Sequence, residues 1–190
     1  MKAPRSTQFA RPAFMEGTRA LTAAEKGTAL HLAMQYIDFS ACSSEAEVKE
    51  EVHRLLEKRL LREEEAKAVD TAAIAAFLAS PLAERIRNAE SLWREYRFTL
   101  LVPAKEYDPA AVSEDEIMLQ GVVDCCIEED GELTVIDFKT DRVNEAMLAE
   151  RCEKYRPQLE AYSAALERIF EKKVREKILY FFAAKKAIKL

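Results

Sequence analysis

The fold of this chain is decided by the stretch GVVDCCIEEDGELTVIDFKTD, residues 121–141. It contains two runs of strand-forming residues on either side of Asp130-Gly131. Asp-Gly between two such runs is a strong signal for a two-residue β-hairpin turn, because both turn positions need a positive φ. A turn centred on these residues pairs Asp124 with Asp137 and places their Cβ atoms about 5 Å apart.

The same register predicts which hairpin residues share a face of the sheet. One face is expected to hold Asp124 with Val122, Cys126, Leu133, Val135, Asp137 and Lys139, and the other Val123, Cys125, Ile127, Thr134, Ile136 and Phe138. Both faces are largely apolar, which favours a hairpin in the middle of a covered sheet. Two facing carboxylates there repel each other and are poorly hydrated. They need a cation, a shared proton or a lysine, and Lys139 is within reach.

Two structural alternatives compete with a functional interpretation of this hairpin. In the first, Asp137 and Lys139 form an ordinary salt bridge and Asp124 lies at a solvated strand end. In the second, a longer loop shifts the register and moves Asp124 away from Asp137.

The rest of the chain predicts an α/β fold with one domain over residues 22–190, after an irregular lead-in or linker over residues 1–21. Residues 22–90 are mostly helical, and residues 91–190 form a sheet core with C-terminal helices. Expected helix starts are a Thr22–Glu25 capping box, Ser43 or Ser44, Asp70, and Ser80-Pro81. Gly27 inside the first helix suggests close approach of another group. The expected strands are 91–102, 116–128, 132–140 and 174–183, with helices over about 144–170 and Pro157 in the first turn of the last one.

Composition excludes several classes of protein. The formal net charge of −5 gives no general argument for nucleic-acid binding. The four cysteines contain no C-x-x-C pair, so zinc and iron–sulfur spacings are missing, and we expect reduced, partly buried thiols in a cytoplasmic protein. Cys125 and Cys126 should point to opposite faces of the sheet. No apolar run is long enough to span a membrane. The sequence contains no phosphate-binding loop, so we expect no ATP site in this chain.

Asp124 followed by Asp137-Phe138-Lys139 resembles the core motif of the PD-(D/E)XK nucleases. The helical stretch YRPQLEAY, residues 155–162, is similar to the Gln-x-x-x-Tyr motif of the RecB-type nucleases in that superfamily. Upstream, EKGTALH, residues 25–31, is similar to their histidine motif. The set covers about residue 11 to the end. It most resembles the C-terminal nuclease domain of the bacterial AddA helicase–exonuclease family, which implies a restriction-endonuclease-like mixed central sheet of about four strands flanked by helices.

The resemblance also implies roles for individual residues. His31, Asp124, Asp137 and the carbonyl of Phe138 would be ligands of Mg²⁺ or Mn²⁺, and Lys139 would orient the attacking water or stabilise developing charge. Gln158 and Tyr162 would support the lysine or contact DNA, and Glu95 would match a further family acid. This sequence lacks the iron–sulfur cysteines found in the sister protein of that family's complex.

The implied function is a metal-dependent deoxyribonuclease, an exonuclease within a helicase–nuclease that processes double-strand DNA ends for recombinational repair. The implied partners are DNA, a helicase region and a second helicase–nuclease subunit. A different hypothesis is a non-catalytic module that keeps the fold and binds DNA or protein. An intact set of Asp124, Asp137 and Lys139 favours the enzyme, because such a module has no physical need for all three.

Overall fold

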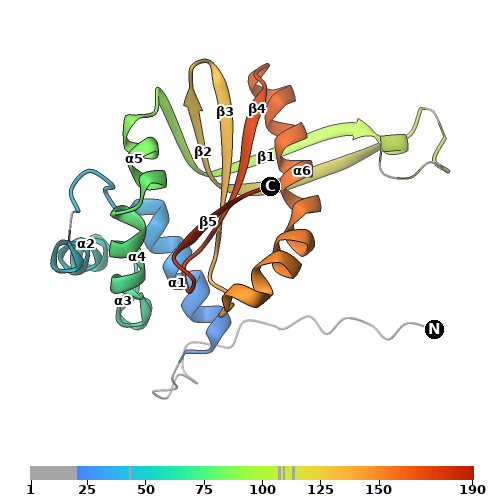
Figure 1. The fold of residues 1–190 in the computed structure, drawn as a ribbon. Helices are drawn as coiled ribbons and strands as arrows, with labels where there is room; N and C mark the ends of the chain where they lie inside the picture. The colour runs from blue at the N-terminus through green and yellow to red at the C-terminus, as the bar shows by residue number, and fades with distance from the viewer. Residues whose placement is uncertain (1–20, 43, 107, 109, 113) are drawn as a thin grey trace, which may run out of the picture.

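The computed structural model describes residues 21–190 except 43, 107, 109 and 113, so the predicted lead-in lies almost entirely outside the described residues. Figure 1 shows a central sheet with helices on both sides and a long two-stranded arm that extends from it. The elements are α1 (Ala23–Tyr36), α2 (Glu45–Glu57), α3 (Glu63–Ala68), α4 (Thr71–Leu78), α5 (Pro81–Asn88), β1 (Ser91–Pro103), η2 (Ala104–Glu106), β2 (Glu116–Glu129), β3 (Glu132–Lys139), η3 (Glu145–Met147), α6 (Leu148–Phe170), β4 (Val174–Phe181) and β5 (Lys186–Lys189).

Within the described residues the sheet has five strands in the order β1-β2-β3-β4-β5. Strands β1, β2 and β3 pair antiparallel, β3 and β4 pair parallel, and β4 and β5 pair antiparallel. This is the mixed, helix-flanked α/β fold that the sequence predicts. The prediction lacked β5, a four-residue strand of sequence Lys-Ala-Ile-Lys. So short a segment carries little strand signal of its own and is held by pairing with β4.

The predicted helix starts are confirmed. Thr22 forms the capping box with Glu25, Ser44 and Asp70 cap α2 and α4, and Ser80 caps α5 with Pro81 in its first turn. Helix α3 was not predicted, since its sequence Glu-Glu-Glu-Ala-Lys-Ala has no apolar stripe and none of its residues is buried.

The prediction of separate helices divided near Pro157 is wrong. Residues 148–170 form one helix, α6, with Pro157 in its interior. A proline there removes one backbone hydrogen bond and favours a bend, and α6 curves along the sheet in Figure 1. The helix continues because side chains before and after Pro157 are buried. Cys152 and Leu159 lie in one apolar cluster, and Leu166 lies in another farther along the helix.

The sheet separates the apolar core into layers. Helices α1 to α5 pack on one face, around Cys125, Ile127, Ile136 and Phe138. Helix α6 covers the other face, where Cys126, Leu133 and Val135 are buried. The four cysteines are free and buried, and Cys125 and Cys126 point to opposite faces as predicted. No helix in the described part of the chain is long and apolar enough to cross a bilayer.

The predicted hairpin turn is confirmed. Asp130 and Gly131 have φ values of 54° and 75°, and Glu129 pairs with Glu132 and Cys125 with Ile136, the register of a two-residue turn. The alternative of a longer loop is therefore excluded.

One part of the face prediction is wrong. Val123 packs beside Cys126 under α6, and Val122 is 36% exposed, so the strict alternation of faces stops between Cys126 and Val123. The cause lies on the neighbouring strand. Glu95 adopts a left-handed backbone with a φ of 50°, and the β1–β2 ladder skips the pair that Glu95 would form with Asp124. Trp93 and Tyr96, on either side of Glu95, consequently both face α6.

Candidate active site

Asp124 lies where the regular pairing of β2 with β3 ends. The last pair of the ladder is Cys125 with Ile136. The prediction that Asp124 pairs directly with Asp137 is therefore wrong. The side chain of Asp124 acts as an acceptor in place of a backbone carbonyl, because the backbone N–H of Phe138 donates to its Oδ2 at 2.7 Å. Only 13% of the Asp124 side chain is exposed, which disagrees with the alternative of a solvated strand end.

His31 reaches this carboxylate from α1. Its Nδ1 lies 3.4 Å from Asp124 Oδ1. Burial alone would lower the pKa of His31. The hydrogen bond to Asp124 and the negative charges of Asp124, Glu95 and Asp137 outweigh that effect, and the pKa is raised above its usual value. The structure therefore brings His31 to the hairpin, as predicted.

Two contacts hold α1 in position against the sheet. A Cβ at Gly27 would lie 2.7 Å from Thr140 Oγ1, so the glycine permits close approach of the helix to the end of β3. At the other end of α1, the Arg94 guanidinium donates to the carbonyls of Met34 at 3.2 Å and Ile37 at 2.6 Å. Arg94 comes directly before Glu95, so the helix that carries His31 is tied to the strand that carries Glu95.

Glu95 completes a cluster of possible metal ligands. One ligand atom each from His31, Glu95 and Asp124 lies within 4.8 Å of the others. Burial and then the charge of Asp124 raise the pKa of Glu95. The left-handed backbone at this residue is unusual for a non-glycine residue and marks a conformation that the surrounding structure enforces.

Asp137 lies next to this cluster and is almost completely buried. Burial and the charge of Asp124 raise its pKa to about 6, although Lys139 and His31 act in the opposite direction. Lys139 Nζ is 2.6 Å from Asp137 Oδ2 and forms an ion pair with it.

The remaining predicted residues surround Lys139. Its Nζ donates to Gln158 Oε1 at 3.1 Å, and Gln158 Nε2 donates to the Tyr162 hydroxyl at 3.0 Å. Gly121 gives the Tyr162 ring its place, because a Cβ there would lie 2.7 Å from Tyr162 Cε1. The structure therefore brings Gln158 and Tyr162 to the lysine.

Two residues near Lys139 had no predicted role. The Tyr155 ring centroid lies 3.9 Å from Lys139 Nζ, and the Tyr155 hydroxyl donates to Asp141 Oδ2. A signal existed for both: Tyr155 stands three residues before Gln158 on the same helix face, and Asp141 stands two residues after Lys139.

The donor set fits a small divalent cation. Carboxylate oxygens and one imidazole are the ligands that Mg²⁺ or Mn²⁺ would use, and His31, Glu95 and Asp124 offer such atoms close together. Phe138 contributes its backbone N–H to Asp124, and a ligand role for its carbonyl stays a prediction.

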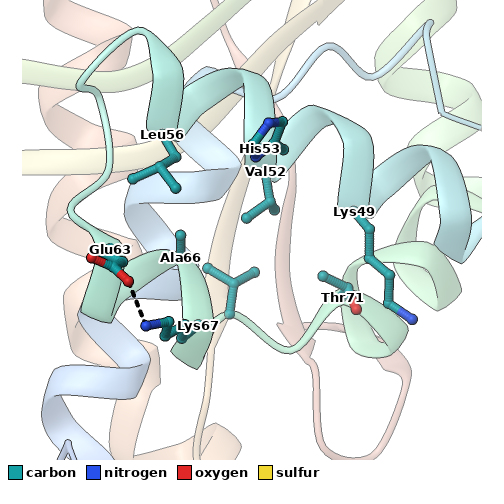
Figure 2. A pocket seen from close by; sticks show the side chains of 9 residues that line it. Lys49, Val52, His53, Leu56, Glu63, Ala66, Lys67 and Thr71 are labelled. Atoms are coloured by element: carbon teal, nitrogen blue, oxygen red, sulfur yellow. Dashed lines mark hydrogen bonds and ion pairs between the residues drawn. The ribbon is translucent and has the colours of Figure 1, made fainter.

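A groove of about 520 Å³ on the helical side contains none of these residues. Figure 2 shows it between α2 and α3, with the Glu63–Lys67 ion pair at its edge. Lys49 and His53 also line the groove and lie beside Glu45 and Glu57. The groove is therefore not part of the candidate active site.

Comparison with known proteins gives consistent results. Residues 6–189 match the PD-(D/E)XK nuclease superfamily. The chain is 38% identical over 181 residues to the A subunit of the ATP-dependent helicase/nuclease of Alkaliphilus oremlandii and 39% identical over 186 residues to that of Clostridium beijerinckii. Each alignment covers 94% of this chain and 15% of the relative, so the chain spans about 15% of the length of these curated relatives. The chain belongs to the PD-(D/E)XK nuclease superfamily.

Proposed function

We propose that the chain is a divalent-metal-dependent deoxyribonuclease that hydrolyses phosphodiester bonds. The observation that carries this proposal is the convergence of His31, Glu95 and Asp124 beside the buried Asp137–Lys139 pair. Packing does not require several acids, a histidine and a lysine to meet at the end of an apolar hairpin, where their desolvation is costly.

In this proposal His31, Glu95, Asp124 and Asp137 hold Mg²⁺ or Mn²⁺, with the carbonyl of Phe138 as a further oxygen ligand. A bound divalent cation neutralises charge on the phosphodiester and lowers the pKa of water. The backbone N–H of Phe138 holds one oxygen of Asp124, which orients the other toward His31.

Lys139 supplies the positive charge that the reaction needs apart from the metal. Its ammonium would orient the attacking water or stabilise the negative charge that develops on the phosphoryl oxygens. Gln158 accepts a hydrogen bond from the ammonium, and Tyr162 in turn holds Gln158. In the proposal these two residues support the lysine or contact DNA.

We propose further that the chain is the nuclease part of a larger helicase–nuclease. The relatives are named as A subunits of an ATP-dependent helicase/nuclease, and they are several times longer than this chain. Exonuclease action on double-strand DNA ends during recombinational repair, a cytoplasmic location and a second subunit belong to this proposal. A helicase region would feed the strand to the site.

The other candidate function is a non-catalytic module that binds DNA or protein. A module of this kind has no need for a buried Asp124 together with the Asp137–Lys139 pair, so the intact set favours the enzyme.

Two variants of the chain, measured beside the parent, test the proposal. Asp124→Ala should abolish both Mn²⁺ binding and DNA cleavage, because a ligand of a small, hard cation is lost. Lys139→Ala should keep or strengthen Mn²⁺ binding, because a nearby positive charge is removed, while cleavage falls by about two to three orders of magnitude. Titration calorimetry and cleavage of labelled linear DNA measure the two effects on the same preparations.

The matched controls are Asp108→Ala and Lys173→Ala, whose side chains are exposed and lie outside the cluster. Both should bind Mn²⁺ and cleave DNA as the parent does. Cleavage that persists in Lys139→Ala would refute the proposed mechanism, and a parent chain without a calorimetric Mn²⁺ signal would favour the non-catalytic module.

A further inference from the structure

Lys139 is held on more than one side. Asp137 Oδ2 lies 2.6 Å from its Nζ, Gln158 Oε1 accepts from it at 3.1 Å, and the centroid of the Tyr155 ring lies 3.9 Å away. Only 14% of the lysine side chain is exposed. The face of an aromatic ring attracts an ammonium group through its quadrupole, and the attraction is stronger when the pair is shielded from water.

The Tyr155 ring is itself fixed. Its hydroxyl donates a hydrogen bond to Asp141 Oδ2, and it projects from α6, the helix that also supplies Gln158. Burial, and after it the hydrogen bond and charge of Asp141, raise the pKa of Tyr155 to about 12. The hydroxyl therefore keeps its proton and remains a donor at neutral pH. Asp141 follows the strand that carries Lys139, so the ring bridges β3 and α6.

We propose that Tyr155, anchored by Asp141, is a positioning residue that holds the ammonium of Lys139 in its reactive place, an inference that rests on the proposed nuclease function. A lysine has a flexible four-carbon stem and a compact charge, and many rotamers are open to it. Asp137 and Gln158 fix the ammonium from the strand and from one turn of α6. The ring supports it from a further direction and needs no hydrogen bond to do so.

The kinetic test separates the ring from the hydroxyl. Tyr155→Phe keeps the aromatic face and loses the bond to Asp141, so kcat for DNA cleavage with Mn²⁺ should fall by no more than about threefold, the size of a weak neutral contribution. Tyr155→Leu loses the face, and its kcat should fall by roughly 10- to 100-fold, since a small misplacement of a reacting group has an effect of this size. KM and the calorimetric affinity for Mn²⁺ should stay near the parent values in both variants.

Asp141→Ala tests the anchor. Its effect on kcat should be as small as that of Tyr155→Phe, and combining the two changes should add nothing, because both remove the same hydrogen bond. The control is Tyr36→Leu, the same substitution at a tyrosine that is 37% exposed and lies outside the candidate site. It should leave kcat unchanged.

A spectroscopic test needs neither metal nor DNA. With lysine labelled with ¹³C at the ε position, the Lys139 methylene protons should resonate upfield of the other lysines, because the ring current of Tyr155 shields them. The Lys139→Ala variant assigns the signal. The upfield shift should remain in Tyr155→Phe and disappear in Tyr155→Leu.

Equal kcat values for the Phe and Leu variants, or a Lys139 signal without an upfield shift in the parent, would overturn the positioning role. The proposed function fails differently, through a parent chain that shows the upfield shift but does not cleave DNA. Thermal unfolding of each variant checks that a loss of kcat is not a loss of fold.

Discussion

At the scale of single residues, the candidate site depends on a glycine, Gly27, at a position with no room for a larger side chain. Gly27 in α1 faces Thr140, whose Oγ1 would lie 2.7 Å from an added Cβ. Threonine is branched at Cβ and stiff, so only one of its staggered rotamers would turn both heavy atoms away from an added Cβ. Glycine inside a helix costs about 1 kcal/mol relative to alanine. At this position it allows α1, which carries His31, to lie close to Thr140.

Gly27→Ala should therefore damage the site in spite of its higher helix propensity. We expect the free energy of unfolding to fall by roughly 1–2 kcal/mol, since forcing an atom into a packed contact costs more than the helix gains. Mn²⁺ binding should weaken, because α1 must move and take His31 away from Asp124. Urea unfolding and titration calorimetry measure the two effects.

The double variant Gly27→Ala/Thr140→Ala is the control. It removes the atom that the new Cβ would meet and should recover stability and Mn²⁺ affinity. A single variant as stable and as metal-binding as the parent would contradict the explanation of Gly27.

At the scale of elements, α5 is joined across the sheet by one arginine. Arg85 donates to Glu129 of β2 at 2.6 Å and to Glu176 of β4 at 2.9 Å, so it links a helix to two strands that are not neighbours. Lys189 of β5 also binds Glu176. Lys189 and then Arg85 hold the pKa of Glu176 below its usual value, although partial burial acts against them.

Arg85→Met should lower the free energy of unfolding at pH 7 by roughly 1–2 kcal/mol, a modest value because the pair is partly exposed. A carboxylate whose folded pKa is lowered contributes stability above its unfolded pKa, about 4.3, and loses it as the pH falls through the folded value. The difference between parent and variant should therefore shrink below about pH 4. Urea unfolding of parent and variant at about pH 7 and at about pH 3.5 measures this difference in stability.

Arg87→Met is the matched control on the same helix. Arg87 donates to the carbonyl of Leu78, which does not titrate, so the effect of this substitution should be the same at both pH values. An Arg85→Met effect that does not change with pH would exclude the proposed link through Glu176.

At the scale of the whole molecule, the candidate site lies where segments from both ends of the chain meet. Helix α1 supplies His31, strands β1, β2 and β3 supply Glu95, Asp124, Asp137 and Lys139, and α6 packs on the opposite face with Gln158 (Figure 1). The formal net charge of the chain is −5, so basic residues are not in excess to neutralise DNA phosphates.

The isolated chain should consequently bind duplex DNA weakly, with a dissociation constant of roughly 10⁻⁴–10⁻⁶ M at physiological salt, the range of non-specific binding. The affinity should fall further as salt increases, since counterion release is its main source. Fluorescence anisotropy with labelled duplex at two salt concentrations measures both properties. Tight binding that does not respond to salt would contradict this expectation.

The sequence by itself determined the elements whose signals are local. The Asp130-Gly131 turn, the caps at Thr22, Ser44, Asp70 and Ser80, and the register of β2 with β3 all follow from neighbouring residues, because turn and cap chemistry acts over a few positions. The motif order, supported by the superfamily match, also led to most of the candidate site, including His31 far upstream of Asp124.

Only the tertiary structure decided what depends on contacts between distant segments. Helix α6 continues through Pro157 because packing on both sides outweighs one lost hydrogen bond, and β5 exists because β4 offers it an edge. The backbone at Glu95 reverses the faces of β1 and β2 and brings that acid to Asp124, which no alternating pattern predicts. Tyr155 meets Lys139 across the α6–β3 contact, and its spacing from Gln158 does not show that its ring lies against the ammonium. Side-chain periodicity describes one element at a time, whereas a site at the junction of several elements depends on how they pack.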